Sequence, residues 1–580
     1  MTHGAETKQN TARRFVGRVS LVIAFFGFVA CSLVVRAVYL QVLDKEFLNR
    51  QADTRHLRTE VIVAHRGAIL DRHGEPLAIS TPVDSIWVNP KQFASTIDSV
   101  PQLAAALGLQ PEALMRRITR SMDKEFLYLK RHVVPQKAQQ VLALKLPGIN
   151  VQREYRRYYP ASEVAGHLVG FTNIDDVGQE GLELAANNWL SGESGAKRVL
   201  KDRRGRSIEN VESIRPPHHG KDLYASIDLR LQYLAYRTLK AAVKSYNAHS
   251  GSVVIIDIAT GEVLAMVNQP TYNPNDRSQF SAERYRNRAI TDIFEPGSSI
   301  KPLIVVAALE SGQYRAGSTI DTSPGYVDIG AKRIEDSRNL GRINLTTILV
   351  RSSNVGITKL AMTLPAEQLW DSLTKFGLGE MTGSGFPGES AGMLTHYSHW
   401  RPISQATIAY GYGISVTPLQ LVQAYAAIGN DGIMQPVSLF AIDGPSAGNR
   451  IMSSDTAVAV RRMLEEVVRP GGTGAKASVS GYRVAGKTGT AWKFAKGGYS
   501  QDKYISIFAG LAPASNPRLA MVVVIDEPGG ELYYGSDVAA PVFANIMSES
   551  LRLLAVAPDA MPLRDPGNVM HAMTRQAAGR

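Results

Sequence analysis

An uncharged apolar run near the amino terminus constrains this chain more than any other feature. Residues 19–35 (VSLVIAFFGFVACSLVV) carry no charged side chain, and a helix of that length spans roughly 25 Å. That is the short end of what crosses the hydrocarbon core of a bilayer. Beyond Arg36 the sequence is again apolar as far as Leu40. We therefore predict one transmembrane helix over residues 19–40.

Basic residues in front of this run predict its orientation. One acid, Glu6, precedes the run, against the four basic residues Lys8, Arg13, Arg14 and Arg18. Because basic tails stay in the cytoplasm, residues 1–18 are expected to form a cytoplasmic tail and the remainder to be exported. A cleaved signal peptide is the alternative, but no small-x-small cleavage site follows the run.

The rest of the composition is that of an ordinary globular protein. With 580 residues, 44% hydrophobic and 20% charged, the chain is too apolar for wholesale disorder and long enough for several domains. Its single cysteine, Cys31, excludes an intrachain disulfide and a cysteine-rich zinc site, and its 12 histidines show no HExxH spacing. We expect no metal and no cofactor. The net charge of +12 is scattered without a nucleic-acid-binding motif, so we expect no nucleic-acid partner.

Proline and glycine near residue 220 divide the exported part. Residues 216–222 read PPHHGKD, and new hydrophobic periodicity begins just beyond them. We predict one domain over 45–215, a second over 222–556 and a flexible tail over 557–580.

The second domain is predicted to be α+β. Asp228 is placed as the N-cap of a helix, and two β-type runs at 251–258 and 261–267 form a hairpin. Two more runs, at 504–511 and 519–525, precede a closing helix that starts near Pro541. This order predicts an antiparallel sheet flanked by helices.

A serine three residues before a lysine on a helix places a hydroxyl and an amine on one face, where the neutral amine can take the serine proton. The pattern occurs five times, at Ser121, Ser194, Ser298, Ser372 and Ser500. Only Ser298 follows a Pro-Gly turn and opens an apolar helical stretch, so its hydroxyl lies at a helix N-terminus. Ser298 is therefore the candidate nucleophile and Lys301 its candidate base.

Two further short motifs follow in order. They are Ser352-Ser353-Asn354 and Lys487-Thr488-Gly489-Thr490, and the latter contains the only Lys-Thr-Gly of the chain. A second Ser-x-Asn, Ser337 to Asn339, shows that the middle motif is weak by itself. On a strand, the side chains of Thr488 and Thr490 would share a face, and strand alternation alone would point Lys487 the other way.

The ordered set of three motifs resembles that of penicillin-binding proteins and serine β-lactamases. Three segments before residue 215 resemble the pedestal of class B penicillin-binding proteins; they are 65–78, 156–160 and 178–183. Four later segments resemble the septal transpeptidases of that class; they are 286–288, 294–297, 410–413 and 417–420. The resemblance runs from the membrane anchor to about residue 555.

The resemblance implies a transmembrane anchor, a mixed α/β pedestal of the penicillin-binding protein dimerisation type over 45–215, and a serine β-lactamase-like transpeptidase domain over 222–556. It implies a serine-type D-Ala-D-Ala transpeptidase that cross-links peptidoglycan stem peptides at the division septum through an acyl-enzyme, with possible residual D,D-carboxypeptidase activity. β-Lactams would acylate the same serine.

The resemblance also implies the roles of individual residues. The implied catalytic residues are Ser298, Lys301, Ser352, Asn354 and Lys487, and the implied substrate-binding residues are Thr488, Gly489 and Thr490. Burial and the second cation, Lys487, would lower the pKa of Lys301. The backbone N–H groups of Ser298 and Thr490 would form the oxyanion hole.

The implied partners are peptidoglycan stems ending in D-Ala-D-Ala, β-lactam antibiotics, the septal lipid II polymerase FtsW and other divisome membrane proteins. The implied location is the inner membrane, with a cytoplasmic N-terminus and a periplasmic catalytic domain. Three alternatives remain: an elongation-type class B transpeptidase, a β-lactamase or penicillin sensor, and a protein that acts mainly as a division scaffold.

Two more groups of residues require an interpretation. Arg66, Asp71 and Arg72 lie beside glycine turns and are interpreted as a structural salt-bridge network. Tyr533 and Tyr534 either line the substrate cleft or pack beside it, because tyrosine serves both uses.

Overall fold

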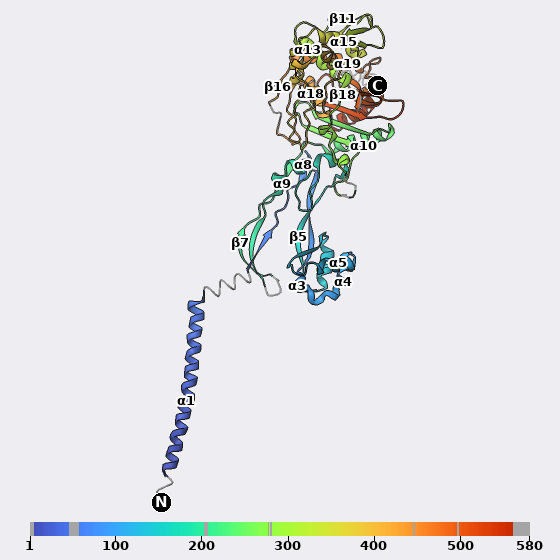
Figure 1. Ribbon diagram of the computed structural model, residues 1–580. Coiled ribbons are helices and arrows are strands. Elements are labelled where there is room, and N and C mark those ends of the chain that lie inside the picture. The colour runs from blue at the N-terminus through green and yellow to red at the C-terminus, as the bar shows by residue number, and fades with distance from the viewer. Residues whose placement is uncertain are drawn as a thin grey trace, which may run out of the picture. The chain divides into compact units, whose positions relative to one another are not determined.

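The computed structural model describes residues 5–45, 57–201, 207–276, 278, 281–444, 447–495 and 498–560. They fall into two compact units (Figure 1). The smaller unit consists of the described residues of Met1–Ala64, Val83–Glu154 and Glu193–His219, and the larger unit of those of His65–Pro82, Tyr155–Gly192 and Gly220–Arg580. Residues 561–580 of the predicted tail lie outside the described residues.

The amino-terminal helix α1 (Ala5–Val38) continues into a short π-helical turn, Tyr39–Leu43. Residues Val16–Val42 are long and apolar enough to cross a membrane, with a mean hydropathy of 2.4 and no buried residues. This range contains the predicted span 19–40, and residues 5–18 of the predicted tail belong to the same helix.

The smaller unit contains strands and helices. Strands β1 (Leu57–Ile62), β6 (Gly195–Lys201) and β7 (Ser207–Arg215) form an antiparallel sheet. The later part of β3 (Pro76–Val88) pairs with β4 (Leu127–Val133). Helices α4 (Val100–Leu107), α5 (Pro111–Thr119) and α6 (Pro135–Ala143) share a core with this pair, around Ile86, Phe93 and Leu103.

A five-stranded antiparallel sheet, in the order β10-β9-β19-β18-β17, organises the larger unit. The strands are β9 (Ser250–Asp257), β10 (Val263–Gln269), β17 (Ala485–Ala495), β18 (Gly498–Ala512) and β19 (Leu519–Asp526). The predicted hairpin and the two later strands are confirmed. Strands from the two ends of the unit meet at the pairing of β9 with β19, and β17 is an edge strand.

Helices cover both faces of this sheet. Helices α10 (Leu229–Ser245) and α20 (Ala539–Leu553) pack on the face that presents Val253. Helices α13 (Lys301–Glu310) and α18 (Pro418–Gly429) pack in the core that contains Val254, on the opposite face. Neighbouring strand residues point to opposite faces, and both faces of β19 are covered, so this strand is apolar at every position except its last, Asp526. The predicted α+β architecture is confirmed.

Residue Asp228 caps α10 as predicted, because its side chain accepts a hydrogen bond from the backbone N–H of Arg230 (3.0 Å). The closing helix α20 begins at Ala539, slightly before the predicted start near Pro541.

The compact units divide the chain differently from the predicted domain ranges. The stretches 65–82 and 155–192 precede residue 215 but lie in the larger unit. Their apolar side chains Leu168 and Leu182 belong to the same core cluster as α13. Sequence order alone could not show this, because these stretches return to the larger unit from two separate places in the chain. The ranges 45–215 and 222–556 stay predictions.

Candidate active site

Residue Ser298 lies in a short 3₁₀-helix, Gly297–Ile300, that leads directly into α13. The preceding Gly297 has a φ of +52°, and a Cβ there would lie 2.9 Å from the carbonyl oxygen of Thr490. Only glycine adopts this conformation readily and leaves that space. The sequence therefore places the nucleophile segment directly against strand β17.

The amine of Lys301 joins the first motif to the second. Its side chain is fully buried. Nζ donates to the carbonyl oxygen of Ser352 (2.6 Å), to Ser352 Oγ (3.2 Å) and to Asn354 Oδ1 (2.8 Å). Residues 51 and 53 positions apart from the lysine thus meet it in one hydrogen-bonded group.

The amine of Lys487 joins the third motif to the same group. Its Nζ donates to Ser352 Oγ (3.2 Å) and to the carbonyl oxygen of Thr488 (3.1 Å). Strand alternation alone would have pointed it elsewhere; instead, the Ser352 hydroxyl lies within hydrogen-bond distance of both amines.

Burial lowers the pKa of both lysines, and like charge lowers that of Lys301 further. Burial lowers the pKa of Lys301 well below its usual 10.5, and the charge of Lys487 lowers it further, while Asp336 acts in the opposite direction. Burial lowers the pKa of Lys487 to about 7. A buried amine that is neutral near pH 7 can accept a proton, so both lysines are suited to general-base chemistry.

Residue Ser352 is held in a strained backbone conformation. It has a φ of +54°, in the left-handed region, at the end of α14 (Leu345–Arg351). Serine seldom adopts this conformation, and such strain is concentrated at functional sites. Here the turn directs both the carbonyl and the hydroxyl of Ser352 toward Lys301.

The carboxylate of Asp336 holds this turn from the other side. It accepts hydrogen bonds from the Ser353 hydroxyl and from the backbone N–H groups of Asn354 (2.6 Å) and Val355 (3.1 Å). Ser353 in turn caps α15 (Asn354–Met362) by accepting from the backbone N–H of Gly356 (2.8 Å). Asp336 is not among the site residues predicted from the sequence. The only motif near it is the second Ser-x-Asn, which begins at the next residue, Ser337.

A cleft of about 690 Å³ opens above these groups. Five of the predicted site residues line it: Ser298, Ser352, Asn354, Thr488 and Thr490. The two lysines lie buried beneath. Ser121, Ser194, Ser372 and Ser500, the other serines of the Ser-x-x-Lys pattern, are not among its lining residues.

A close approach of the backbone accounts for glycine at position 489. A Cβ there would lie 2.8 Å from the carbonyl oxygen of Pro296. The close approach that requires glycine is thus to the backbone just before Ser298, and the contact of Gly489 with a substrate stays a prediction. The residue fixes the spacing between the nucleophile segment and β17.

The two tyrosines after β19 have separate uses. Tyr534 lines the cleft and is 53% exposed. Tyr533 stacks on Tyr504 with ring centroids 4.0 Å apart. The next residue, Gly535, donates its N–H to the Thr490 hydroxyl (3.0 Å).

Residue Arg66 belongs to a buried ion group away from the cleft. Arg66 Nε donates to Glu183 Oε2 (2.8 Å) and Arg157 Nε donates to Glu183 Oε1 (2.6 Å). Asp71 accepts backbone N–H groups from His73 and Leu229. The geometry agrees with the structural interpretation of Arg66 and Asp71.

Residue Arg72 pairs with Glu262 at 3.2 Å.

Across the described residues, no three His, Cys, Asp or Glu side chains come together as a metal site.

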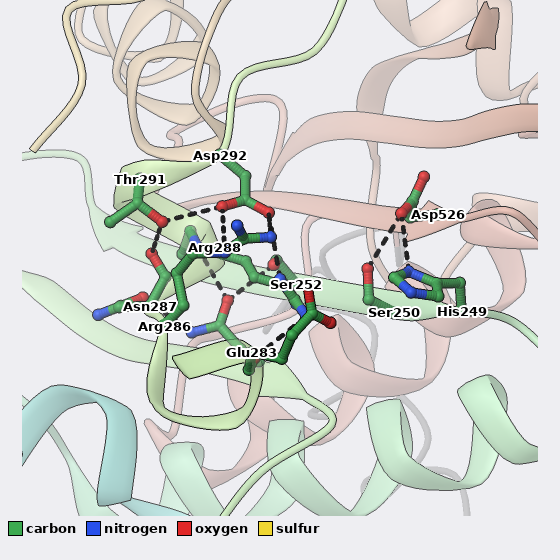
Figure 2. Close-up of polar contacts among 12 residues, drawn as sticks. His249, Ser250, Ser252, Glu283, Arg286, Asn287, Arg288, Thr291, Asp292 and Asp526 are labelled. Carbon is green, nitrogen blue, oxygen red and sulfur yellow. Dashed lines mark hydrogen bonds and ion pairs between the residues drawn. The ribbon is translucent and has the colours of Figure 1, made fainter. Parts of the chain in front are cut away.

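A second cavity, of about 370 Å³, lies beside the segment that leads to Ser298. Figure 2 shows Asp292 accepting hydrogen bonds from both Arg286 (3.1 Å) and Arg288 (3.3 Å), and Asp526 accepting one from Ser250 (3.2 Å). The arginines are thus paired with a carboxylate on their own segment. This arrangement braces the chain shortly before the nucleophile.

Two family models match the chain. The penicillin binding protein transpeptidase domain matches residues 251–548, and the penicillin-binding protein dimerisation domain matches residues 61–225.

Similar proteins and structures cover most of the chain. It is 43% identical over 569 residues to peptidoglycan D,D-transpeptidase FtsI of Escherichia coli (strain K12), covering 97% of this chain and 95% of that protein. The apo transpeptidase domain of Burkholderia pseudomallei penicillin-binding protein 3 is 42% identical, covers 58% of this chain and 98% of its own, and gives a TM-score of 0.54. A peptidoglycan synthetase from Bifidobacterium adolescentis is 26% identical, covers 88% of this chain and 98% of its own, and gives a TM-score of 0.70.

Proposed function

This chain belongs to the family of penicillin-binding protein transpeptidases and is a serine-type peptidoglycan D,D-transpeptidase; we propose that Ser298 is its nucleophile. One observation carries the proposal: Ser298 lines the cleft together with Ser352 and Asn354, and these two residues accept hydrogen bonds from the buried amine of Lys301. Peptidoglycan is the substrate class, and β-lactams bind the same domain.

Acylation begins when the neutral amine of Lys301 takes the proton of the Ser298 hydroxyl. Ser298 Oγ then attacks the carbonyl carbon of the penultimate D-alanine, and the bond to the terminal D-alanine nitrogen breaks. The Ser352 hydroxyl, which lies between the two amines, relays this proton from Lys301 to that nitrogen, so Lys301 is neutral again. The terminal D-alanine leaves, and the stem remains as an ester on Ser298.

Transfer reverses these proton movements. The amine of a neighbouring stem attacks the ester carbonyl and loses its proton through Ser352, and Ser298 Oγ leaves and regains a proton from Lys301. Water in place of the amine would give D,D-carboxypeptidase activity. A β-lactam would form the same ester but keep its leaving group tethered.

Substrate binding is assigned to the edge of β17. The hydroxyls of Thr488 and Thr490 grip the terminal carboxylate, and Asn354 holds a stem amide. The backbone N–H groups of Ser298 and Thr490 stabilise the oxyanion, with roughly 3 kcal/mol for each donor. The close packing of Gly297 on Thr490 supports this assignment, because it brings the two donor segments together.

The site is further proposed to work in the periplasm at the division septum. Helix α1 would anchor the chain in the inner membrane with its N-terminus in the cytoplasm, since basic residues precede the span. FtsW, the septal lipid II polymerase, and other divisome membrane proteins are the proposed partners. The non-catalytic pedestal is assigned to 45–215 and the transpeptidase domain to 222–556. Midcell localisation of a fluorescent fusion is expected; side-wall localisation would contradict the septal role.

The chemistry is tested with the full-length protein in detergent, a pentapeptide stem and an amine-bearing acceptor stem. At least one D-alanine should be released for each cross-link formed, and a β-lactam should stop both. The Ser298→Ala variant should form no cross-link. D-Alanine release by Ser298→Ala, or rapid turnover of the β-lactam by the wild type, would contradict the proposal.

A further inference from the structure

A cluster of four aromatic rings lies where β17 leaves the cleft. The ring of Tyr412 is 5.3 Å from that of Tyr499 and 6.4 Å from that of Trp492, and Tyr499 is 5.5 Å from Phe494. Three of the side chains are strongly exposed: Trp492 is 49%, Phe494 69% and Tyr499 42% accessible. We call these four residues the aromatic platform.

Hydrogen bonds hold the platform in place. The Tyr412 hydroxyl accepts from the backbone N–H of Trp492 (3.2 Å), and the Tyr499 hydroxyl donates to the Glu295 carboxylate (2.9 Å). Glu295 also accepts the backbone N–H of Gly413 (2.8 Å). The rings are therefore positioned before any ligand arrives, which lowers the entropic cost of binding.

The exposed surface of the platform is mainly apolar and carries an unpaired N–H donor. Contiguous exposed aromatic side chains mark binding surfaces more often than chance. Among the described residues, the indole N–H of Trp492 has no hydrogen-bond partner. The nearby amine of Lys493 is already paired with Asp526 (2.9 Å) and Glu527 (2.7 Å). This composition favours a neutral ligand with an apolar face over an acidic peptide.

The platform is continuous with the cleft. The side chain of Trp492 lies two residues beyond Thr490 on β17, so it is on the same face of the strand. A bulge then interrupts the pairing with β18, and beyond it Phe494 pairs with Tyr499. The exposure of this strand rises from Thr488 at 7% to Phe494 at 69%.

The proposed binding mode sets the direction in which a donor stem leaves the cleft. Its terminal carboxylate is held at Thr488 and Thr490, and the scissile carbonyl, one residue earlier in the stem, faces Ser298 and Thr490. The rest of the stem therefore runs along the edge of β17 toward Trp492. This is the way an extended peptide adds to an exposed sheet edge.

The length of the donor stem determines which part of the substrate reaches the platform. In a pentapeptide stem the first residue precedes the penultimate one by three positions, or about 10 Å at strand spacing. From Thr490, Trp492 is about 7 Å along the strand and Phe494 about 14 Å. The sugar to which the first stem residue is attached therefore arrives over Phe494 and Tyr499, with Trp492 alongside the junction.

Resting on the proposed function, we infer that the aromatic platform of Trp492, Phe494, Tyr499 and Tyr412 binds the N-acetylated hexose ring that carries the donor stem. One face of a pyranose ring presents polarised C–H groups, which lie favourably on the electron-rich face of an aromatic ring. The free indole N–H donates to a hydroxyl or acetamide oxygen at the ring edge. The platform thereby distinguishes glycan-borne stems from free peptides.

The test compares two donors with the full-length protein: a disaccharide-linked pentapeptide and the same pentapeptide without sugar. The measured quantity is the ratio of their kcat/KM values in cross-linking. The double variant Trp492→Leu/Phe494→Leu keeps apolar area but removes the flat rings, and the ratio should fall about tenfold. Trp492→Phe with Phe494 intact should keep most of it.

The matched control is Tyr233→Leu, an equally exposed aromatic (53%) on α10, which should leave the ratio unchanged. A wild-type ratio near one, or equal ratios in wild type and double variant, would overturn the inference while cross-linking itself persists. Absence of both cross-linking and labelled-penicillin acylation in the wild type would instead overturn the proposed function.

Saturation-transfer NMR with an N-acetylglucosamine tetrasaccharide gives a second readout. The sugar should contact the wild type, and this contact should be lost in the double variant. Sugar contact retained by the variant would also contradict the inference.

Discussion

Two groups of charges are buried in the larger unit, and they are built in opposite ways. Around Glu183, two arginines donate to one carboxylate, and all three side chains are almost fully buried. Around Ser352, two lysines are buried together, and the atoms that accept from them are carbonyl, hydroxyl and amide oxygens. In the first group both cations share one anion; in the second, like charges face one hydroxyl.

The difference separates structure from chemistry. A buried ion pair with complementary charge keeps both groups ionised and leaves no group ready to exchange a proton. Two buried amines without a directly bonded carboxylate have lowered pKa values and become bases near neutral pH. Burial of charge is thus common to both regions. A buried partner of opposite charge keeps a group ionised, whereas a buried partner of like charge favours its neutral form.

The largest expected effect comes from replacing an amine of the second group by a side chain that cannot lose its positive charge. In Lys301→Arg the guanidinium stays protonated at any working pH, so it cannot take the Ser298 proton. Acylation by a labelled penicillin should slow roughly 10³- to 10⁴-fold. Gel fluorescence over time measures the rate, and circular dichroism confirms the fold. A rate within tenfold of the wild type would remove Lys301 as the base.

The complementary change breaks the first group. Glu183→Gln leaves two buried guanidinium groups without a counter-charge, which should cost about 3–5 kcal/mol of stability. Thermal unfolding should show a clearly lower Tm, while the folded fraction should still be acylated at the wild-type rate. A wild-type Tm, or a lost acylation rate in folded protein, would contradict the structural role.

The pH profile tests the second group without mutation. Because the folded-state pKa of Lys487 is about 7, this amine is neutral above that pH and takes up a proton below it. The pKa of Lys301, the amine that must be neutral for acylation, is also lowered. The acylation rate should fall, by up to tenfold per pH unit, as the pH drops through the range in which these amines take up protons. A rate that is flat down to pH 5 would contradict a role for the titration of Lys487 in the reaction.

The smallest expected effect comes from Asp336, the nearby carboxylate that acts on Lys301. Its negative charge raises the pKa of that amine, so Asp336→Asn should move the acid limb of the profile to lower pH, by less than one unit. The maximal rate should also fall severalfold, because the turn at Ser353 and Asn354 loses a charged acceptor. If the acid limb of the profile moves to higher pH instead, the negative charge of Asp336 does not raise the pKa of Lys301.

Much of this fold could be predicted from the sequence. Local sequence patterns predicted the hairpin of β9 and β10, the cap at Asp228 and the strands β18 and β19, because these elements depend on residues close together in the chain. It could not give the pairing of β9 with β19, which joins strands more than 250 residues apart. Hydrophobic patterns identify strands but carry no information about distant partners.

The candidate site shows the same limit. The three motifs named the residues that now line or underlie the cleft, because each motif is local. The reach of Lys487 to Ser352 came from family resemblance and not from alternation. Asp336 had no spacing signal, since it lies directly after a short strand, Lys332–Glu335, and 18 residues before Asn354, which it contacts. The actual constraint on Gly489, the carbonyl of Pro296, comes from a segment almost 200 residues away.

The most direct test of the account is peptide mapping by mass spectrometry after reaction with penicillin. The wild type should carry one stoichiometric adduct, on the peptide containing Ser298, that decays far more slowly than it forms. Ser298→Ala should carry none, and Lys301→Arg should reach the same adduct only after a much longer time. An adduct on Ser121, Ser194, Ser372 or Ser500, or one that forms equally fast in Lys301→Arg, would contradict the claim that two buried amines activate Ser298.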